Sequence, residues 1–369
     1  MRILHMDTGR GWRGGQQQVL WLLEGCRVLG IEQTLLTPAG SPLAARARQS
    51  GVTVSEIAAR LLTVENLRAV RRLAPQFDLA HAHDSHAHSL FCAAHPLRGR
   101  GRGWPPLVVS RRVGFPIRSL GRAKYRFASR YIAVSEYVRC RLLEAGVPEE
   151  KLRVIYDGVR PPPLLPEPEA RTEFRRRQRA LEGAFVFGTL SSFAPEKLLA
   201  EQLDLLKQLP ASAHFWLGIP GAEQDSGSAG TALLEAARRD GLSARFRIIP
   251  VAEDAGAFLT SLDLFLYLSR MEGLGSAILL AMAHQLPVMA SNVGGIPEIV
   301  RHQQTGVLVG EDRELPAAVQ FLMGVPQLRR RMGEAARRFV LAHASSDKMV
   351  AQTVVLYREL LQGSTETRA

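Results

Sequence analysis

Residues 269–306 read SRMEGLGSAILLAMAHQLPVMASNVGGIPEIVRHQQTG, and this stretch is more informative than the rest of the chain. Glu272 precedes a glycine-containing turn at residues 273–275, and the following segment, Ser276–Ala283, has the composition of a helix. The first amides of a helix have no partner within it. This helix start would therefore point free N–H groups at an anion.

A buried strand and a second glycine turn follow that helix. Residues 286–291 form a short apolar run typical of a buried strand. Gly294 and Gly295 then allow the backbone to approach a ligand closely, and Pro297 suits the first turn of another helix. In this order, the carboxylate, the helix start and the two glycine turns favour a nucleotide-sugar pocket.

The rest of the chain alternates short apolar strands with helical segments. We expect helices at 16–29 and 42–50, and strands at 2–6, 33–37, 79–82, 108–110, 131–134, 184–190, 213–217, 246–249 and 264–267. Such alternation predicts right-handed βαβ units and parallel sheets. Because 369 residues exceed what one core usually organises, we expect two α/β domains, joined by the proline-rich residues 161–170.

Three further stretches complete a family pattern. They are GWRGGQQQVLWLL (11–23), YIAVSEYVRCRLLEAGVPEEKLRVIYDGV (131–159) and FGTLSSFAPEK (187–197). Together with residues 269–306 they resemble, in order and over nearly the whole chain, the retaining glycosyltransferases of family 4. This resemblance implies the GT-B fold, an α/β architecture of two Rossmann-like, doubly wound parallel-sheet domains facing a cleft.

The resemblance also implies how the chain is divided. Residues 1–165 would form an N-terminal domain on the acceptor side, and residues 166–345 a C-terminal domain that binds the nucleotide-sugar donor. Residues 346–369 would comprise a helix at 347–361, which packs back on the N-terminal domain, and a frayed tail.

By the same resemblance, three side chains carry the chemistry. Glu272 matches the glutamate that binds a hydroxyl of the transferred sugar, Lys197 the lysine that neutralises the donor diphosphate, and His83 the histidine that contacts the sugar. Further donor contacts are expected from Gly14, Gly15, Gly273, Leu274 and Gly275. No metal and no cofactor are expected, since the nucleoside-diphosphate sugar is a co-substrate.

The chain departs from the family at two donor-binding positions. Leu280 stands where the family has a second glutamate, which binds the ribose diol, and Ser192 stands where it has an arginine. Loss of a charge-assisted hydrogen bond costs about 1.5–3 kcal/mol. A second hypothesis is therefore a GT-B protein that binds or scaffolds without turnover. The residues that could compensate are Arg270, Arg301 and Glu298.

Residues 77–88, FDLAHAHDSHAH, contain four of the ten histidines, His81, His83, His86 and His88. Residues two apart on a strand share a face, so both His81 and His83 could face the cleft. By the resemblance, His81 is a packing or hydrogen-bonding neighbour of His83. Asp84 either orients His83 or caps the following helix. Because such groupings bind zinc, a remote alternative is a metal hydrolase that uses the His81–His88 cluster.

The net charge of +12 is concentrated in the N-terminal half. Residues 1–160 carry 25 Lys or Arg against 12 Asp or Glu, and residues 98–130 carry ten basic residues and no acidic one. Such a surface would attract an anionic membrane or a phosphorylated glycolipid. The aromatic residues there lack the spacing of a base-stacking platform, so no nucleic acid is expected. We assign the acceptor or membrane side to Arg111, Arg112, Arg118 and Lys124.

Location follows from what the sequence lacks. No apolar run reaches the roughly 18 residues that span a bilayer, and MRILHMD does not have the pattern of a signal peptide. The three scattered cysteines fit a reducing compartment. We expect a cytoplasmic protein, peripheral at the inner face of the plasma membrane.

The resemblance and the basic N-terminal half together predict the activity. We expect a retaining, metal-independent hexosyltransferase acting on a cell-envelope glycan or glycolipid, as in lipopolysaccharide or polysaccharide biosynthesis.

Overall fold

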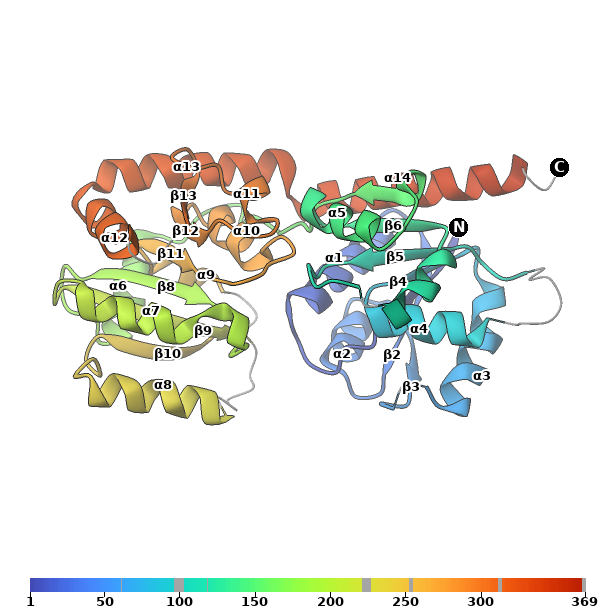
Figure 1. Ribbon diagram of the computed structural model, residues 1–369, viewed down its shortest axis with the longest axis horizontal. Helices are drawn as coiled ribbons and strands as arrows, with labels where there is room; N and C mark the ends of the chain where they lie inside the picture. Colours follow the sequence, from blue (N-terminus) through green and yellow to red (C-terminus); the bar gives the residue numbers. More distant parts are fainter. Residues whose placement is uncertain are drawn as a thin grey trace. The chain divides into compact units, whose positions relative to one another are not determined.

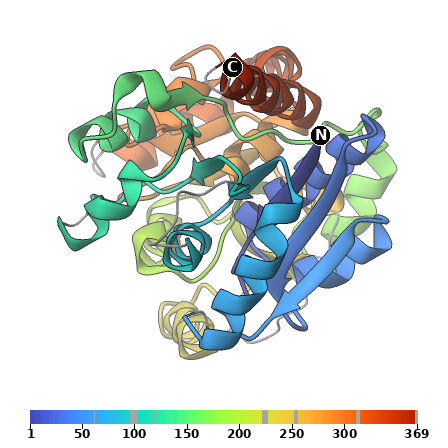
Figure 2. The same ribbon diagram turned by 90° about the vertical axis from the view of Figure 1, so that its right-hand side faces the viewer.

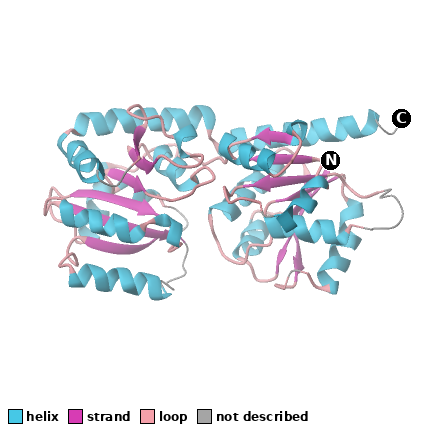
Figure 3. Cartoon of the chain, in the orientation of Figure 1, coloured by secondary structure: helices cyan, strands magenta, loops and turns pink. Residues whose placement is uncertain are grey.

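The computed structural model describes residues 1–60, 62–95, 103–117, 119–220, 227–251, 255–310 and 314–366. The chain forms two compact units (Figure 1). The first unit comprises Met1–Gly158 together with Ser346–Ala369, and the second comprises Val159–Ser345. Each unit contains a central sheet with helices packed against it, as the strands and helices of Figure 3 show.

The first unit contains a seven-stranded parallel sheet in the order β3-β2-β1-β4-β5-β6-β7. Its strands are β1 (Arg2–Met6), β2 (Glu32–Pro38), β3 (Thr53–Ile57), β4 (Leu79–Ala82), β5 (Leu107–Arg111), β6 (Arg130–Ala133) and β7 (Leu152–Val154). The chain builds the sheet outward from β1 in one direction and then, from β4, in the other. This reversal is the hallmark of a doubly wound sheet.

Helices connect these strands and form the rest of the first unit. They are α1 (Gly14–Val28), α2 (Pro42–Gln49), α3 (Val64–Leu73), α4 (Ser85–Ala94), α5 (Glu136–Glu144) and α14 (Ser346–Glu366), with 3-10 turns η1 (Ala74–Gln76), η2 (Ser119–Arg126) and η3 (Glu149–Lys151). Figure 2 shows this unit with α14 in dark red. A β-carbon on Gly25 of α1 would lie 2.6 Å from Val350 of α14, so these two helices pack closely.

The final helix, α14, continues beyond residue 361, where the sequence predicted its end. Residues 363–366, which were expected to fray, belong to this helix.

The second unit contains a six-stranded parallel sheet in the order β10-β9-β8-β11-β12-β13. Its strands are β8 (Phe185–Leu190), β9 (Ala213–Pro220), β10 (Phe246–Val251), β11 (Leu264–Tyr267), β12 (Val288–Ser291) and β13 (Gly306–Val309). Its helices are α6 (Pro168–Arg177), α7 (Leu199–Leu205), α8 (Gly227–Arg239), α9 (Gly256–Thr260), α10 (Ser276–Ala283), α11 (Ile296–Ile299), α12 (Leu315–Gly324) and α13 (Pro326–His343), with 3-10 turns η4 (Pro195–Lys197) and η5 (Leu206–Gln208). Strand order reverses here between β8 and β11.

The expected fold class, two Rossmann-like parallel-sheet domains, is confirmed. Three strands were not expected from the sequence, namely β3, β7 and β13. Each lies at the edge of its sheet and is only partly buried. Edge strands need no continuous apolar run, which is the signal that identified the central strands. No helix among the described residues combines the length and the apolar character needed to cross a membrane.

The structural division of the chain precedes the sequence-based boundary at residues 165 and 166. The amide of Val159 donates to the carbonyl of Ala344 at 2.9 Å. Arg337 Nη2 donates to the carbonyl of Pro162 at 2.6 Å. These contacts attach the start of the proline-rich stretch to the second unit. Its last residues, from Pro168, already belong to α6.

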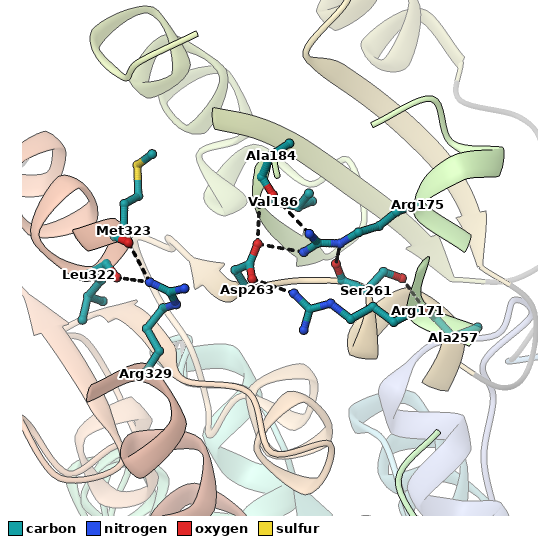
Figure 4. Close-up of polar contacts among 10 residues, drawn as sticks. All are labelled: Arg171, Arg175, Ala184, Val186, Ala257, Ser261, Asp263, Leu322, Met323 and Arg329. Atoms are coloured by element: carbon teal, nitrogen blue, oxygen red, sulfur yellow. Dashed lines mark hydrogen bonds and ion pairs between the residues drawn. The ribbon is translucent and has the colours of Figure 1, made fainter. Parts of the chain in front are cut away.

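A charged network fixes the start of β11 beside β8 (Figure 4). Asp263 Oδ1 accepts from Arg171 Nη2 at 2.6 Å, and Oδ2 accepts from Arg175 Nη2 at 2.7 Å. The same Oδ2 accepts from the amide of Val186 at 2.8 Å. Arg175 also donates to the carbonyls of Ser261 and Ala184. The network therefore joins α6, β8 and β11, the elements that support the candidate site at the opposite ends of these strands.

Candidate functional site

The candidate residues gather where each sheet reverses its strand order. In open α/β sheets, ligands bind outside the carboxyl ends of the strands at such a switch point. In the first unit this point lies between β1 and β4, and His83 directly follows β4. In the second unit it lies between β8 and β11, and Lys197 and Glu272 follow these two strands.

Lys197 and Glu272 are in direct contact. Lys197 Nζ lies 2.6 Å from Glu272 Oε2, and the two side chains are 15% and 17% exposed. The hydroxyl of Tyr267, the last residue of β11, lies 2.7 Å from Lys197 Nζ and 2.6 Å from Glu272 Oε2. The site in this unit is thus a compact group of a cation, an anion and a phenol.

The backbone around Glu272 requires glycine at a neighbouring turn. Gly273 donates its amide to Glu272 Oε1 at 3.1 Å, and Gly295 donates its amide to the Glu272 carbonyl at 3.2 Å. Gly294 has φ +59°, and a β-carbon there would lie 2.0 Å from that carbonyl oxygen. A side chain at position 294 would therefore displace the loop that carries the carboxylate.

The start of α10 lies three residues after Gly273. Gly275, with φ +103°, precedes the helix, and the first hydrogen bond to its carbonyl comes from the amide of Ile278 at 2.9 Å. Gly273, Leu274 and Gly275 are buried. The first amides of this eight-residue helix therefore lie a few residues after Glu272 in sequence, and the expectation that they bind an anion stays a prediction.

The two positions at which the sequence departs from the family pattern lie within eight residues of Glu272 or Lys197 in sequence, but their side chains differ in exposure. Leu280 is half-buried on α10, and Ser192 is exposed in the loop after β8. Of the residues that could compensate, Arg270 reaches Glu201 at 3.4 Å, and Arg301 lies over the ring of Phe339 at 5.1 Å. Both arginines therefore already have partners within the unit.

In the first unit, the glycine loop leads directly into α1. The helix starts at Gly14, and its first hydrogen bond runs from the amide of Gln17 to the carbonyl of Arg13 at 3.1 Å. A β-carbon on Gly15 would meet no described atom within 4 Å. The structure therefore places Gly14 and Gly15 at an open helix start.

Asp7 shapes the beginning of this loop and was not expected from the sequence. Its Oδ1 accepts from the amide of Gly9 at 2.9 Å and from Gln16 Nε2 at 3.1 Å. Burial, reinforced by the nearby Asp84 carboxylate, raises the pKa of Asp7 to about 6. Its position directly after the strand Arg2–Met6 was a usable signal, because polar residues at strand carboxyl ends line ligand sites.

His83 belongs to a buried histidine cluster that includes His5, which sequence reasoning missed. His5 Nδ1 lies 2.9 Å from His83 Nε2. His81 bonds through both ring nitrogens, to the Tyr357 hydroxyl at 2.5 Å and to Ser110 Oγ at 2.8 Å. Burial lowers the pKa of His5 to about 3 and that of His83 well below its usual value, so both imidazoles are neutral at neutral pH.

The histidines expected to cluster divide into two groups. Among the described residues, one nitrogen each of His5, His81 and His83 lie within 4.8 Å of one another, a spacing that could hold a metal ion. His86 is exposed, and His88 Nε2 contacts the carbonyl of Lys124 at 3.1 Å. In the structure both nitrogens of His81 take part in hydrogen bonds, whereas His5 Nε2 and His83 Nδ1 are buried without a hydrogen-bond partner among the described residues.

Asp84 caps a helix rather than orienting His83. Its Oδ1 accepts from the amides of His86 and Ala87 at 2.7 and 2.9 Å, at the start of α4. The amide of Thr8 donates to Oδ2 at 2.6 Å. Asp84 therefore ties the start of α4 to the loop after β1.

Three of the four basic residues assigned to the acceptor or membrane side have partners inside the unit. Arg111 is buried and donates to the Tyr125 hydroxyl at 2.9 Å. Arg112 bonds Asp157 Oδ1 and the His83 carbonyl, each at 3.1 Å. Lys124 donates to Ser85 and Ser89. Arg118 lies outside the described residues. Charge counting missed these contacts because it ignores burial.

The two Rossmann-like sheets, with their candidate residues at the switch points, define a GT-B protein with a candidate sugar-nucleotide site. Residues 170–339 match the family model described as Glycosyl transferases group 1, and residues 12–161 match that of Glycosyltransferase Family 4. The chain belongs to the group 1 glycosyltransferases.

Similar proteins agree with this assignment. The chain is 30% identical over 290 residues to the GDP-mannose-dependent alpha-(1-6)-phosphatidylinositol monomannoside mannosyltransferase of Mycolicibacterium smegmatis, covering 73% of this chain and 70% of that one. It is 36% identical over 112 residues to the N-acetyl-alpha-D-glucosaminyl L-malate synthase of Bacillus anthracis, spanning 30% of this chain but only 29% of that relative's length. The crystal structure of Anabaena Alr3699/HepE in complex with UDP and glucose has the same fold, with a TM-score of 0.85 and 20% identity over 97% of this chain and 100% of that chain.

Proposed function

We propose that this protein is a retaining, metal-independent glycosyltransferase. It would move a sugar from a nucleoside-diphosphate sugar to a glycan or glycolipid of the cell envelope, as in lipopolysaccharide or polysaccharide biosynthesis. One observation carries the proposal. The Lys197 ammonium and the Glu272 carboxylate meet at 2.6 Å at the switch point of the second sheet, in the loops that precede α7 and α10.

These residues have distinct tasks in the proposed reaction. Lys197 and the first amides of α10 stabilise the leaving nucleoside diphosphate, where negative charge develops. Glu272 binds a sugar hydroxyl and orients the anomeric carbon, and His83 contacts the same sugar. Retention follows if the acceptor attacks on the face that the diphosphate leaves, with the leaving phosphate taking the acceptor proton. A product of inverted anomeric configuration, seen by NMR, would contradict this path.

The donor is the first point to test. We expect calorimetric titration of the full chain with GDP, UDP, ADP and their sugar conjugates to show micromolar binding of one nucleotide class. GDP-mannose and UDP-glucose come first, because the M. smegmatis relative is named for GDP-mannose and the Anabaena structure holds UDP and glucose. Binding of none of them would favour a GT-B protein that scaffolds without turnover.

Two variants then show whether the ordinary donor pocket survives. Leu280→Glu and Ser192→Arg restore the charged groups that the family has at these positions. If the pocket is otherwise retained, each variant should bind the preferred donor about tenfold or more tightly, the value of one charge-assisted hydrogen bond. No gain in either variant would mean that the pocket binds its nucleotide in a different way.

Metal removal tests the proposed role of Lys197 as the cation at the leaving group. We expect dialysis against EDTA to leave the transfer rate unchanged, and added Mg²⁺ or Mn²⁺ not to raise it. The measurement is the initial rate with the preferred donor, alongside the metal content of the dialysed protein. A rate that falls with EDTA and returns with Zn²⁺ would point instead to the cluster of His5, His81 and His83.

We also propose that the first unit binds an anionic membrane surface that holds the acceptor. Exposed Phe115 and Phe127 accompany the exposed Arg126 in the segment after β5, a combination suited to a lipid interface. We expect co-sedimentation with vesicles that contain anionic phospholipid, and less of it for Phe115→Ser/Phe127→Ser. Equal sedimentation with neutral vesicles would contradict the electrostatic part of this proposal.

A further inference from the structure

Tyr267 contacts both charged residues of the candidate donor site. It is the last residue of β11 and is only 5% exposed. Its hydroxyl lies 2.6 Å from Glu272 Oε2 and 2.7 Å from Lys197 Nζ, while these two groups are 2.6 Å apart. The three polar groups form a closed triangle that joins the loops after β8 and β11.

The donor and the acceptor of each hydrogen bond in this triangle follow from the chemical groups involved. An ammonium only donates and an ionised carboxylate only accepts. The Tyr267 hydroxyl therefore accepts from Lys197 and donates its single proton to Glu272. Burial, reinforced by the Glu272 carboxylate, raises the pKa of Tyr267 well above its usual value, so the phenol keeps that proton.

The triangle also determines which carboxylate oxygen can serve a ligand. Glu272 Oε2 accepts from both Lys197 and Tyr267. Oε1 accepts from the Gly273 amide alone among the contacts of the described residues, so it retains acceptor capacity for a sugar hydroxyl. Lys197 likewise has a third N–H beyond its bonds to Glu272 and Tyr267.

We propose that Tyr267 is a positioning residue of the donor site, which holds Lys197 toward the diphosphate and Glu272 toward the sugar. This inference rests on the proposed function. When a diphosphate draws the ammonium away from Glu272, the carboxylate keeps the hydrogen bond from Tyr267, and the ammonium keeps Tyr267 as an acceptor. Without the hydroxyl, an ammonium drawn away by the diphosphate would leave Glu272 with the Gly273 amide as its remaining hydrogen-bond donor among the described residues.

The test is Tyr267→Phe, which removes one oxygen and keeps the ring. The Phe ring retains the contact with Lys197, whose Nζ lies 4.9 Å from the ring centroid, and the stacking on Phe265. The readout is the ratio of affinities for GDP over GMP and for UDP over UMP, by calorimetry on the full chain. We expect this diphosphate advantage to fall about tenfold or more, with monophosphate affinity unchanged, because the hydroxyl's charge-assisted hydrogen bonds to Lys197 and Glu272 are lost.

Two comparisons separate positioning from a general loss of packing. Tyr131→Phe removes another buried hydroxyl, which donates to the Tyr125 carbonyl at 2.7 Å in the first unit, and should leave the ratio unchanged. In a Lys197→Met background, adding Tyr267→Phe should change diphosphate affinity by less than about twofold, because the hydroxyl acts on phosphate through Lys197.

Each outcome decides the inference. An unchanged diphosphate advantage in Tyr267→Phe, or additive losses in the double variant, would overturn the positioning role while leaving the proposed function intact. A Tyr267→Phe chain that fails to fold would also overturn it, in favour of a purely structural role. Absence of GDP and UDP binding in the unsubstituted protein would instead reject the proposed function itself.

Discussion

Replacing Lys197 by methionine is expected to lower kcat/KM for sugar transfer by about 100- to 1,000-fold, the usual cost of losing one group that stabilises charge in the transition state. Methionine keeps the length and apolar stem of the side chain but has no charge. Glu272 keeps hydrogen bonds from Tyr267 and Gly273 in this variant, so the loop should remain folded. The measurement is the steady-state rate of transfer with the preferred donor.

Lys207→Met is the matched control for this substitution. Lys207 lies on η5 of the same unit and pairs with Asp204 and Asp240 at the surface. We expect its kcat/KM to stay within about twofold of the unsubstituted protein, because surface ion pairs contribute little. Equal activity of the two lysine variants would remove Lys197 from the proposed mechanism.

Replacing Asp263 by alanine is expected to lower the free energy of unfolding of the second unit by about 3 kcal/mol, because it leaves the largely buried Arg175 guanidinium without its charged partner. The Asp263 side chain is 14% exposed and pairs with Arg171 and Arg175. The substitution also leaves the Val186 amide without its carboxylate acceptor. Arg175 would keep its bonds to the Ser261 and Ala184 carbonyls, which are drawn in Figure 4.

Urea denaturation of the full chain, with amide hydrogen exchange read in peptides from β8 and β11, measures this effect. Exchange resolves the second unit even if the two units unfold separately. Glu334→Ala is the control, since Glu334 is 42% exposed and lies 4.0 Å from Arg330. Loss of less than about 1 kcal/mol is expected for it. Identical stability of both variants would mean that the Asp263 network contributes no net stabilisation.

Sequence patterns predicted the central strands more reliably than the edges. β1, β4 and β11 begin and end at the expected residues, since nearly all of their residues are buried and most are apolar. β3, β7 and β13 could not be predicted in the same way, because each lies at the edge of its sheet and is partly exposed. From the sequence, the proline-rich stretch is predicted only to join the two domains, because the sequence cannot show that Arg337 bonds the Pro162 carbonyl.

Candidate site residues follow the same division. Lys197, Glu272 and the glycine turns could be identified from the sequence, because each lies in a short motif of neighbouring residues that resembles one of the family's. Tyr267 and His5 did not, because an apolar strand offers no sign that its tyrosine or histidine will meet a residue 70 or 78 positions away. Arg111 and Lys124 looked like surface cations for the opposite reason, since charge alone does not reveal a buried guanidinium or an ammonium hydrogen-bonded to serines.

Sequence alone was enough to predict the class of fold and the positions of the glycine turns, because hydrophobic periodicity and backbone freedom are local properties of the chain. Gly294 is an example, since its φ of +59° and its closeness to the Glu272 carbonyl both require glycine. The family followed from the resemblance of four ordered motifs. Which side chains contact one another became known only from the tertiary structure. It brought Lys197, Tyr267 and Glu272 into one triangle and gave His83 a partner in His5, because parallel strands place their carboxyl ends side by side whatever their separation along the chain.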